Sequence, residues 1–445
     1  MKKIAIAGAG LVGSLMSLYL VRRGYAVTLY ERRSDFRKAG GYGGRSINLA
    51  LSNRGLRALA EVGLDEAMRT HALPMHGRMV HTKDGAVSFQ RYGNEGQYIN
   101  SISRIELNRV VLDAAEAAGV STRFSCRISS VDLATPSFSV TGEDGQREEI
   151  STDLLIGADG AFSAVRAAMQ VTDRFDYGQS YIEHGYKELT IPSGADGSFQ
   201  LDPNALHIWP RERYMLIALP NPDRTFTCTL FFPFEGSPSF RELSDDRKVM
   251  DFFRSVFPDA ERLMPGLLED YRSNPASSLV TVRCYPWVKG KTLLIGDAAH
   301  AIVPFYGQGM NAGFEDCRVL NALLDQHADD WQQVLPEFQR LRKPDADAVS
   351  RLALDNFIEM RDLVADPGFL LRKKIEGRLH ARFPNEWIPL YSMVTFHDEI
   401  NYADAYQIGQ RQKSVMEEVL AMPGIADRWD TIDLEGIMHR FRETR

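Results

Sequence analysis

Cysteine is scarce in this sequence, and the positions of the few cysteines exclude two common kinds of site. Cys126, Cys228, Cys284 and Cys317 lie far apart and form no CxxC pair. Neither a disulfide framework nor a zinc site is therefore indicated, and we expect the chain to work in a reducing compartment. The ten histidines also lack ligand spacing such as HExxH, so no metal site is predicted.

Long hydrophobic runs and an excess of positive charge are missing as well. No run of about 18 uncharged apolar residues occurs, so no membrane-spanning helix is expected. Glycines punctuate the first apolar stretch, which has no cleavage-like end and is therefore no signal peptide. The formal net charge of −7 argues against a nucleic-acid partner, because binding phosphates requires a clustered positive field. A small organic substrate fits this balance better.

What the chain does have is size and alternating α/β patterning. Its 445 residues, 44% of them hydrophobic, suffice for two or more domains with a real core. Residues 3–8 predict a buried strand, 11–23 a helix and 26–31 a second strand, which together form a βαβ unit. A helix over 104–119, and a strand that runs into a turn over 152–160, imply another α/β pair.

The middle of the chain changes character. Short alternating runs from about 178 to 235 predict antiparallel strands, and a helix over 241–257 follows them. A strand near 279–285 leads back to a strand, turn and helix at KTLLIGDAAH. The predicted fold class is α/β with an α+β insert, divided into a Rossmann-like domain (1–175, with substrate-side strands near 73–100), an antiparallel-sheet substrate domain (176–285), a return to the first domain (286–325) and a helical C-terminal region (326–445).

A dinucleotide fingerprint opens the chain. Gly8, Gly10 and Gly13 form GxGxxG between a strand and a helix, where glycine permits a tight turn and close approach of a pyrophosphate. Glu31 ends the second strand 18 residues after Gly13, close to the spacing at which a carboxylate accepts hydrogen bonds from ribose hydroxyls. NAD and FAD share this half-site, so the pattern leaves the dinucleotide open.

A second Gly-rich, acid-bearing loop, GDAAHAIVPFYGQGMNAGFED over 296–316, favours FAD. FAD is longer than its ADP half and needs contacts at the ribityl chain and ring. A strand delivers Asp297 to a ribityl hydroxyl, and Gly307 and Gly309 let backbone amides at a helix start face the flavin's pyrimidine edge. The alternative for Asp297, and for Asp159 in GADG, is a turn-capping carboxylate. His300 is given no catalytic role, because a packed or solvated histidine is as reasonable.

The order GxGxxG, then GADGAFSAVR over 157–166, then the 296–316 loop resembles the single-component FAD-dependent aromatic hydroxylases. The resemblance implies a Rossmann-like FAD-binding domain of that type, in which the chemistry is carried by the flavin and no side chain is catalytic. It places Asp159 and Gly160 in a motif linked to FAD and NAD(P)H, and NADPH as a transient co-substrate without a Rossmann domain of its own. The implied FAD contacts also include Val12, Arg32, Ala50, Arg104, Gly309, Met310 and Asn311.

A narrower resemblance rests on GGRSINLALSNRG (43–55), HGRMVHTKDG (76–85), YINSISRIELNRVVLDAA (98–115) and PLYSMVTF (389–396). Together these segments are similar to the kynurenine 3-monooxygenase family, which uses FAD, NADPH and O₂ to convert L-kynurenine to 3-hydroxy-L-kynurenine through a hydroperoxide at flavin C4a. The resemblance implies substrate contacts from Arg78, Tyr92, Asn356 and Tyr391, with Phe305 and Tyr306 bordering the ring pocket. An arginine suits the substrate's carboxylate.

The alternatives are a related hydroxylase acting on a phenol or benzoate, and a non-catalytic binding protein on the same fold that has lost its flavin. Without the resemblance, Asn356 would be interpreted as an exposed helix residue and Arg78 as a solvated one. Eukaryotic family members carry an apolar C-terminal anchor, whereas this sequence ends GIMHRFRETR. We therefore expect a soluble, cytoplasmic enzyme of the bacterial type without a membrane anchor; the oligomeric state is left open.

Overall fold

A parallel sheet forms the base of the molecule. The computed structural model describes residues 2–38, 48–360 and 366–444. Its six-stranded sheet has the order β18-β19-β12-β1-β2-β8, in which only the edge strand β18 is antiparallel. The strands are β1 (Lys3–Ala7), β2 (Ala26–Tyr30), β8 (Ser121–Arg123), β12 (Leu154–Gly157), β18 (Val288–Lys289) and β19 (Thr292–Leu294). The sequence AVTLY and its neighbours are apolar on both faces, as a covered parallel sheet requires.

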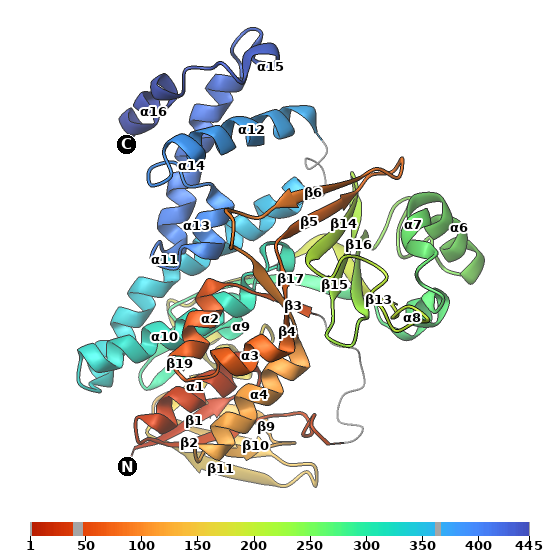
Figure 1. Cartoon of the computed structure of the whole chain (residues 1–445). Helices are drawn as coiled ribbons and strands as arrows, with labels where there is room; N and C mark the ends of the chain where they lie inside the picture. The colour runs from red at the N-terminus through yellow and green to blue at the C-terminus, as the bar shows by residue number, and fades with distance from the viewer. Residues whose placement is uncertain (1, 39–47, 361–365, 445) are drawn as a thin grey trace.

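Both faces of this sheet are covered (Figure 1). Helix α1 (Leu11–Arg22) packs against α4 (Arg104–Ala117) and α10 (Gly309–Gln326) on one side. On the other side lies a small antiparallel sheet of β9 (Arg127–Asp132), β10 (Ser137–Thr141) and β11 (Arg147–Ser151), from which Phe138 meets Tyr30 edge-on at a ring distance of 5.1 Å. The predicted βαβ unit is confirmed.

A seven-stranded sheet stands above the parallel one, in the order β17-β13-β16-β15-β14-β5-β6. Its strands are β5 (Gly77–His81), β6 (Val87–Arg91), β13 (Asp176–Ile191), β14 (Ala205–Arg211), β15 (Tyr214–Pro220), β16 (Phe226–Pro233) and β17 (Ser277–Tyr285). The strands between 178 and 235 pair antiparallel as predicted. Strand β5 joins β14 in parallel, because it enters the sheet from a distant part of the chain.

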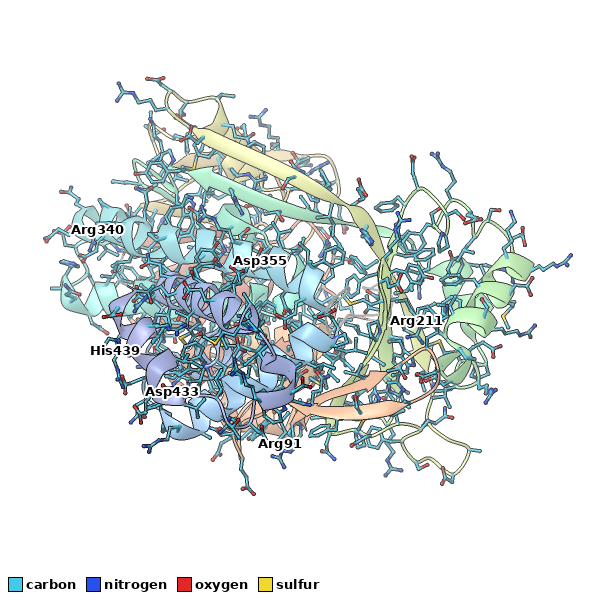
Figure 2. The ribbon with its side chains drawn as sticks, turned by 90° about the horizontal axis from the view of Figure 1, so that it is seen from above. Arg91, Arg211, Arg340, Asp355, Asp433 and His439 are labelled. Carbon is cyan, nitrogen blue, oxygen red and sulfur yellow. The ribbon has the colours of Figure 1, made fainter. Side chains whose placement is uncertain are left out.

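Three helices cover the outer face of the seven-stranded sheet: α6 (Asp246–Val256), α7 (Pro258–Glu261) and α8 (Leu267–Ser273). The prediction of a helix over 241–257 was wrong at its start, because the Asp245 side chain accepts a hydrogen bond from the Lys248 N–H and so caps α6 there. Arg211 lies between the sheet and these helices in Figure 2, and its Nε donates to the Val256 carbonyl at 2.9 Å.

Helices make up most of the described C-terminal region (331–444), as predicted. They are α11 (Trp331–Ile358), α12 (Pro367–Arg382), α13 (Leu390–Phe396), α14 (Tyr402–Leu420), α15 (Ile425–Arg428) and α16 (Leu434–Glu443), at the top and left of Figure 1. In the described parts of the chain, every helix is too short or too polar to cross a membrane. The remaining elements are α2 (Asn53–Ala60), α3 (Asp65–His71), α5 (Ala164–Gln170), α9 (Asp297–His300), the 3₁₀ turn η1 (Pro304–Tyr306) and the sheet β3-β7-β4, formed by β3 (Asn48–Leu51), β7 (Ile99–Ser103) and β4 (Ala72–Met75).

Candidate functional site

A cavity of about 580 Å³ runs between the two large sheets. Its wall combines the carboxyl ends of β1, β2 and β12 with the loop after β19, strand β3 and the inner face of the seven-stranded sheet. The carboxyl ends of parallel strands are where open α/β folds bind ligands. The sequence-predicted residues on this wall are Gly8, Gly10, Val12, Glu31, Arg32, Ala50, Arg78, Tyr92, Arg104, Asp159, Gly160, Asp297, Phe305, Tyr306, Gly307, Gly309, Met310 and Tyr391.

The first glycine loop fits a dinucleotide phosphate. A Cβ added at Gly13 would lie 2.0 Å from the Gly8 carbonyl oxygen, so this glycine is needed to pack the helix on the loop. A Cβ added at Gly10 would meet no atom within 4 Å, because Gly10 faces the open cavity. The two glycines therefore serve different ends: Gly13 closes the turn, and Gly10 leaves room for a ligand at the start of α1.

Glu31 lies at the end of β2, where the ribose contact was predicted. Its Oε2 accepts the Ala9 N–H at 3.0 Å and its Oε1 accepts the Arg33 N–H at 3.0 Å. The carboxylate is thus oriented by two backbone amides. Each oxygen keeps a lone pair for a hydroxyl donor on the cavity side.

The GADG turn follows β12. Asp159 lines the cavity, and its Oδ2 also accepts the N–H groups of Ala164 at 2.7 Å and Val165 at 3.3 Å. The turn-capping interpretation therefore describes one of its oxygens. Burial raises the pKa of Asp159. Gly160 has φ of +81°, and a Cβ there would meet nothing within 4 Å, so the turn leaves the cavity open beside the carboxylate.

The loop after β19 forms the wall opposite the glycine loop. Asp297 is exposed to the cavity, although Ala298, Ala299 and His300 behind it are buried. Gly309 and Met310 begin α10 and line the cavity, and a helix leaves the N–H groups of its first turn without intrahelical partners. Amide donors at a helix start stabilise negative charge, which suits the pyrimidine edge of a reduced flavin.

Three tyrosines and an arginine close the other end of the cavity. The Tyr391 ring stacks between Tyr92, at 5.2 Å, and Tyr306, at 5.5 Å. The Arg78 guanidinium lies 5.5 Å from the Tyr92 ring centroid and 5.1 Å from that of Tyr391. Within the described residues, Arg78 Nε has no hydrogen-bond partner. Buried polar atoms of this kind usually have partners, so this end of the cavity is suited to a polar ligand group.

Two predicted contact residues lie behind the wall. Asn356 is buried, not exposed, and its Nδ2 donates to the Phe305 carbonyl at 2.6 Å. Asn311 donates from Nδ2 to the carbonyls of Ala50 and Gly307, both at 2.8 Å, and accepts the Ser52 N–H at 3.0 Å. Both amide side chains therefore fix the wall segments in front of them.

The sequence analysis missed a buried network of charges behind the 296–316 loop. Asp316 Oδ2 accepts the Gly296 N–H at 3.0 Å and lies 2.6 Å from His300 Nε2, while Arg342 Nε donates to its Oδ1 at 2.8 Å. Arg342 also binds Glu315, at 2.7 Å. His300 thus has a structural partner. The run FED at 314–316, two acids where a helix passes through the core, was the available signal.

We expect Asp316→Asn to make the free energy of unfolding depend less on pH under acidic conditions. Burial alone would raise the Asp316 pKa, but the charges of His300 and Arg342 outweigh burial and lower it to about 2. The ionised Asp316 carboxylate therefore contributes fully to the free energy of unfolding above pH 3.8, the ordinary pKa of aspartate. This contribution is lost as the pH falls from there towards 2. Urea unfolding followed by tryptophan fluorescence should show a loss of about 2 kcal/mol at pH 7 and a weaker dependence below pH ~4.

The matched control is Asp325→Asn, on the same helix, where the side chain is 66% exposed beside Arg23. A surface ion pair contributes at most about 1 kcal/mol, so the unfolding free energy of this variant should depend on acidic pH as it does in wild type. The same dependence of the unfolding free energy on acidic pH in wild type and Asp316→Asn would contradict the prediction.

Comparison with known proteins decides the family. Residues 1–352 match the family described as FAD binding domain. A kynurenine 3-monooxygenase of Flavobacterium johnsoniae is 50% identical over 435 residues, which cover 97% of each chain. One of Myxococcus xanthus is 49% identical over 94% of this chain and 90% of its own. The chain belongs to the kynurenine 3-monooxygenase family.

Membership confirms the predicted flavin monooxygenase class, and FAD is the cofactor. A solved structure described as 2-methyl-3-hydroxypyridine-5-carboxylic acid oxygenase matches with a TM-score of 0.67 at 20% identity, over 83% of this chain and 95% of that one. This likeness confirms the predicted aromatic hydroxylase fold. The open glycine loop, the exposed Asp297 and the helix start at Gly309 are the features of this chain that fit FAD.

Proposed function

We propose that the chain hydroxylates L-kynurenine to 3-hydroxy-L-kynurenine with NADPH and O₂, in the cytoplasm. The observation that carries the proposal is the closed end of the cavity, where Arg78 lies beside Tyr92 and Tyr391 with its Nε unpaired among the described residues. A substrate with an α-amino acid group places its carboxylate on such a guanidinium, which binds carboxylates bidentately.

We propose a division of labour along the cavity. The parallel-sheet region (1–175 and 286–325) holds FAD through Gly10, Glu31 and Asp297, and the seven-stranded sheet (176–285 with the strands near 73–100) holds the substrate. Bound FAD supplies hydride acceptance and the activation of O₂. The chain's own residues position the substrate and exclude water.

The aromatic ring of the substrate is placed by apolar side chains. Leu206, Met215, Ile217 and Phe231 from the seven-stranded sheet line the cavity between Arg78 and the 296–316 loop. A carboxylate held at Arg78 therefore directs the ring along this apolar wall towards Gly307 and Met310. These apolar side chains keep water out of the part of the cavity that holds the substrate ring. The substrate's own amine activates the ring, so the step needs no side-chain base.

The test is NADPH consumption by the purified yellow protein, with and without L-kynurenine, with product mass and H₂O₂ followed together. A substrate-dependent rise and a product one oxygen heavier would support the proposal. Turnover of 4-hydroxybenzoate or salicylate with kynurenine inert would favour a phenol or benzoate hydroxylase, since Arg78 suits those carboxylates as well.

A further inference from the structure

Arg54, in the first turn of α2, is a buried cation outside the cavity wall. Its side chain is 0% exposed. Nε donates to the Val394 carbonyl at 2.9 Å, and Nη2 donates to the carbonyls of His397, at 3.2 Å, and Ile400. Nη1 forms an ion pair with Glu315 at 2.7 Å. One guanidinium therefore joins α2, α10 and the end of α13.

Of the carbonyls that Arg54 binds, that of Val394 lies in the last turn of α13, where a helix leaves its carbonyls without intrahelical partners, and those of His397 and Ile400 lie in the segment that follows. α13 ends at Phe396, and its last turn contains no basic residue that could satisfy them. Asn53 adds a second contact, because its Nδ2 donates to the Phe396 carbonyl at 2.9 Å. A cation at a helix C-terminus also stabilises the negative end of the helix dipole. The first turn of α2 thus caps α13 from outside.

α13 matters because it carries Tyr391 into the cavity. Tyr391 is the middle ring of the stack with Tyr92 and Tyr306, and it lies beside Arg78. The helix has only seven residues, Leu390–Phe396, and helices this short are marginal without external contacts. The position of the Tyr391 ring therefore depends on what holds the C-terminal end of α13.

The same turn of α2 is connected to the flavin side. Strand β3, which carries Ala50, runs into α2 through Ser52, and the Ser52 N–H binds Asn311. Glu315, the ionic partner of Arg54, lies on α10, whose first turn lines the cavity. Arg54 therefore connects α13, which bears Tyr391, to β3 and to α10, two elements that line the cavity on the flavin side.

We propose that Arg54, supported by Asn53, is a positioning residue for substrate binding: it holds the C-terminal end of α13 so that Tyr391 stays stacked beside Arg78. It touches neither substrate nor cofactor. The identity of the substrate, L-kynurenine, rests on the proposed function. The link between α2 and α13 does not depend on it.

The test compares Arg54→Lys with wild type as holoenzyme. Lysine keeps the charge beside Glu315 but lacks the planar fork that reaches several carbonyls. We expect retained FAD, a KM and a Kd for L-kynurenine raised about tenfold, and a kcat changed less than about threefold. Amide hydrogen exchange in residues 390–400 should become faster. The Kd is measured from the flavin absorbance change of the oxidised holoenzyme, without turnover.

The matched control is Arg57→Lys. Arg57 lies one turn further along α2, is 50% exposed and forms an ion pair with Asp398. It should leave KM unchanged and should alter the exchange of residues 390–400 much less than Arg54→Lys does, because lysine can keep this exposed ion pair. In a Tyr391→Leu background, Arg54→Lys should raise KM by less than about twofold, because the residue through which it acts is gone. Asn53→Ala gives a second, milder variant should Arg54→Lys fail to fold, with KM raised about threefold.

Unchanged KM and exchange in Arg54→Lys would overturn the proposal. So would an equal, full effect in the Tyr391→Leu background, or faster exchange throughout the chain with FAD loss while Asn53→Ala behaves as wild type. If wild type neither binds nor hydroxylates L-kynurenine, the proposed function fails. The exchange of residues 390–400 then decides by itself whether Arg54 positions α13.

Discussion

Arg78→Met is expected to raise the Kd of L-kynurenine about 100-fold while the protein stays yellow. Hydrogen bonds to a charged group contribute about 1.5–3 kcal/mol each, and a carboxylate on this guanidinium would lose its bidentate partner. The flavin should remain, because Arg78 lies on β5, at the end of the cavity away from the glycine loop. The Kd is measured from the flavin absorbance change of the oxidised protein.

Folding should survive this substitution. Arg78 is half-buried, its Nε is buried without a partner within the described residues, and a buried polar atom without a partner is costly to the folded state. Methionine fills a similar volume without that cost. The control is Arg91→Met, on the neighbouring strand β6, where the side chain is exposed at the outer edge of the molecule in Figure 2. Equal affinities in Arg78→Met and wild type would remove Arg78 from the substrate site.

Gly13→Ala and Gly10→Ala are expected to fail in different ways. The Cβ at position 13 would lie 2.0 Å from the Gly8 carbonyl oxygen, so backbone must shift. We expect a loss of about 3 kcal/mol or more in the free energy of unfolding of the FAD-free protein. The Cβ at position 10 meets no protein atom within 4 Å. That variant should keep its FAD-free stability and lose FAD affinity by at least about tenfold, because the methyl group occupies ligand space.

The two variants serve as each other's control. Urea unfolding without FAD measures stability, and flavin fluorescence on adding FAD measures binding. A destabilised FAD-free Gly10→Ala, or wild-type FAD affinity in it, would contradict the assignment of Gly10 to the phosphate contact. A stable Gly13→Ala would show that the turn can open to admit a methyl group.

Local patterns predicted the elements that depend on local physics. Apolar strands, the glycine turn and the helix after it follow from neighbours in the chain, and β1, α1 and β2 lie where the spacing placed them. The start of α6 was missed because apolar spacing gives a period and not a boundary, whereas the Asp245 cap sets the boundary. Helical spacing alone suggested that Asn356 is exposed, but it is buried against the Phe305 carbonyl. The spacing does not tell which face of the helix packs against another segment.

The sequence by itself determined the class of protein: its glycine loops, their order and the family segments identify a flavin hydroxylase, because backbone turns and phosphate contacts require particular residues at fixed local spacing. Only the tertiary structure decided which side chains meet. Arg54 binds carbonyls more than 300 residues away along the chain, and Arg78, Tyr92 and Tyr391 converge from strand β5, the bend after β6 and a late helix. Such contacts depend on packing between distant segments, and no local pattern encodes them.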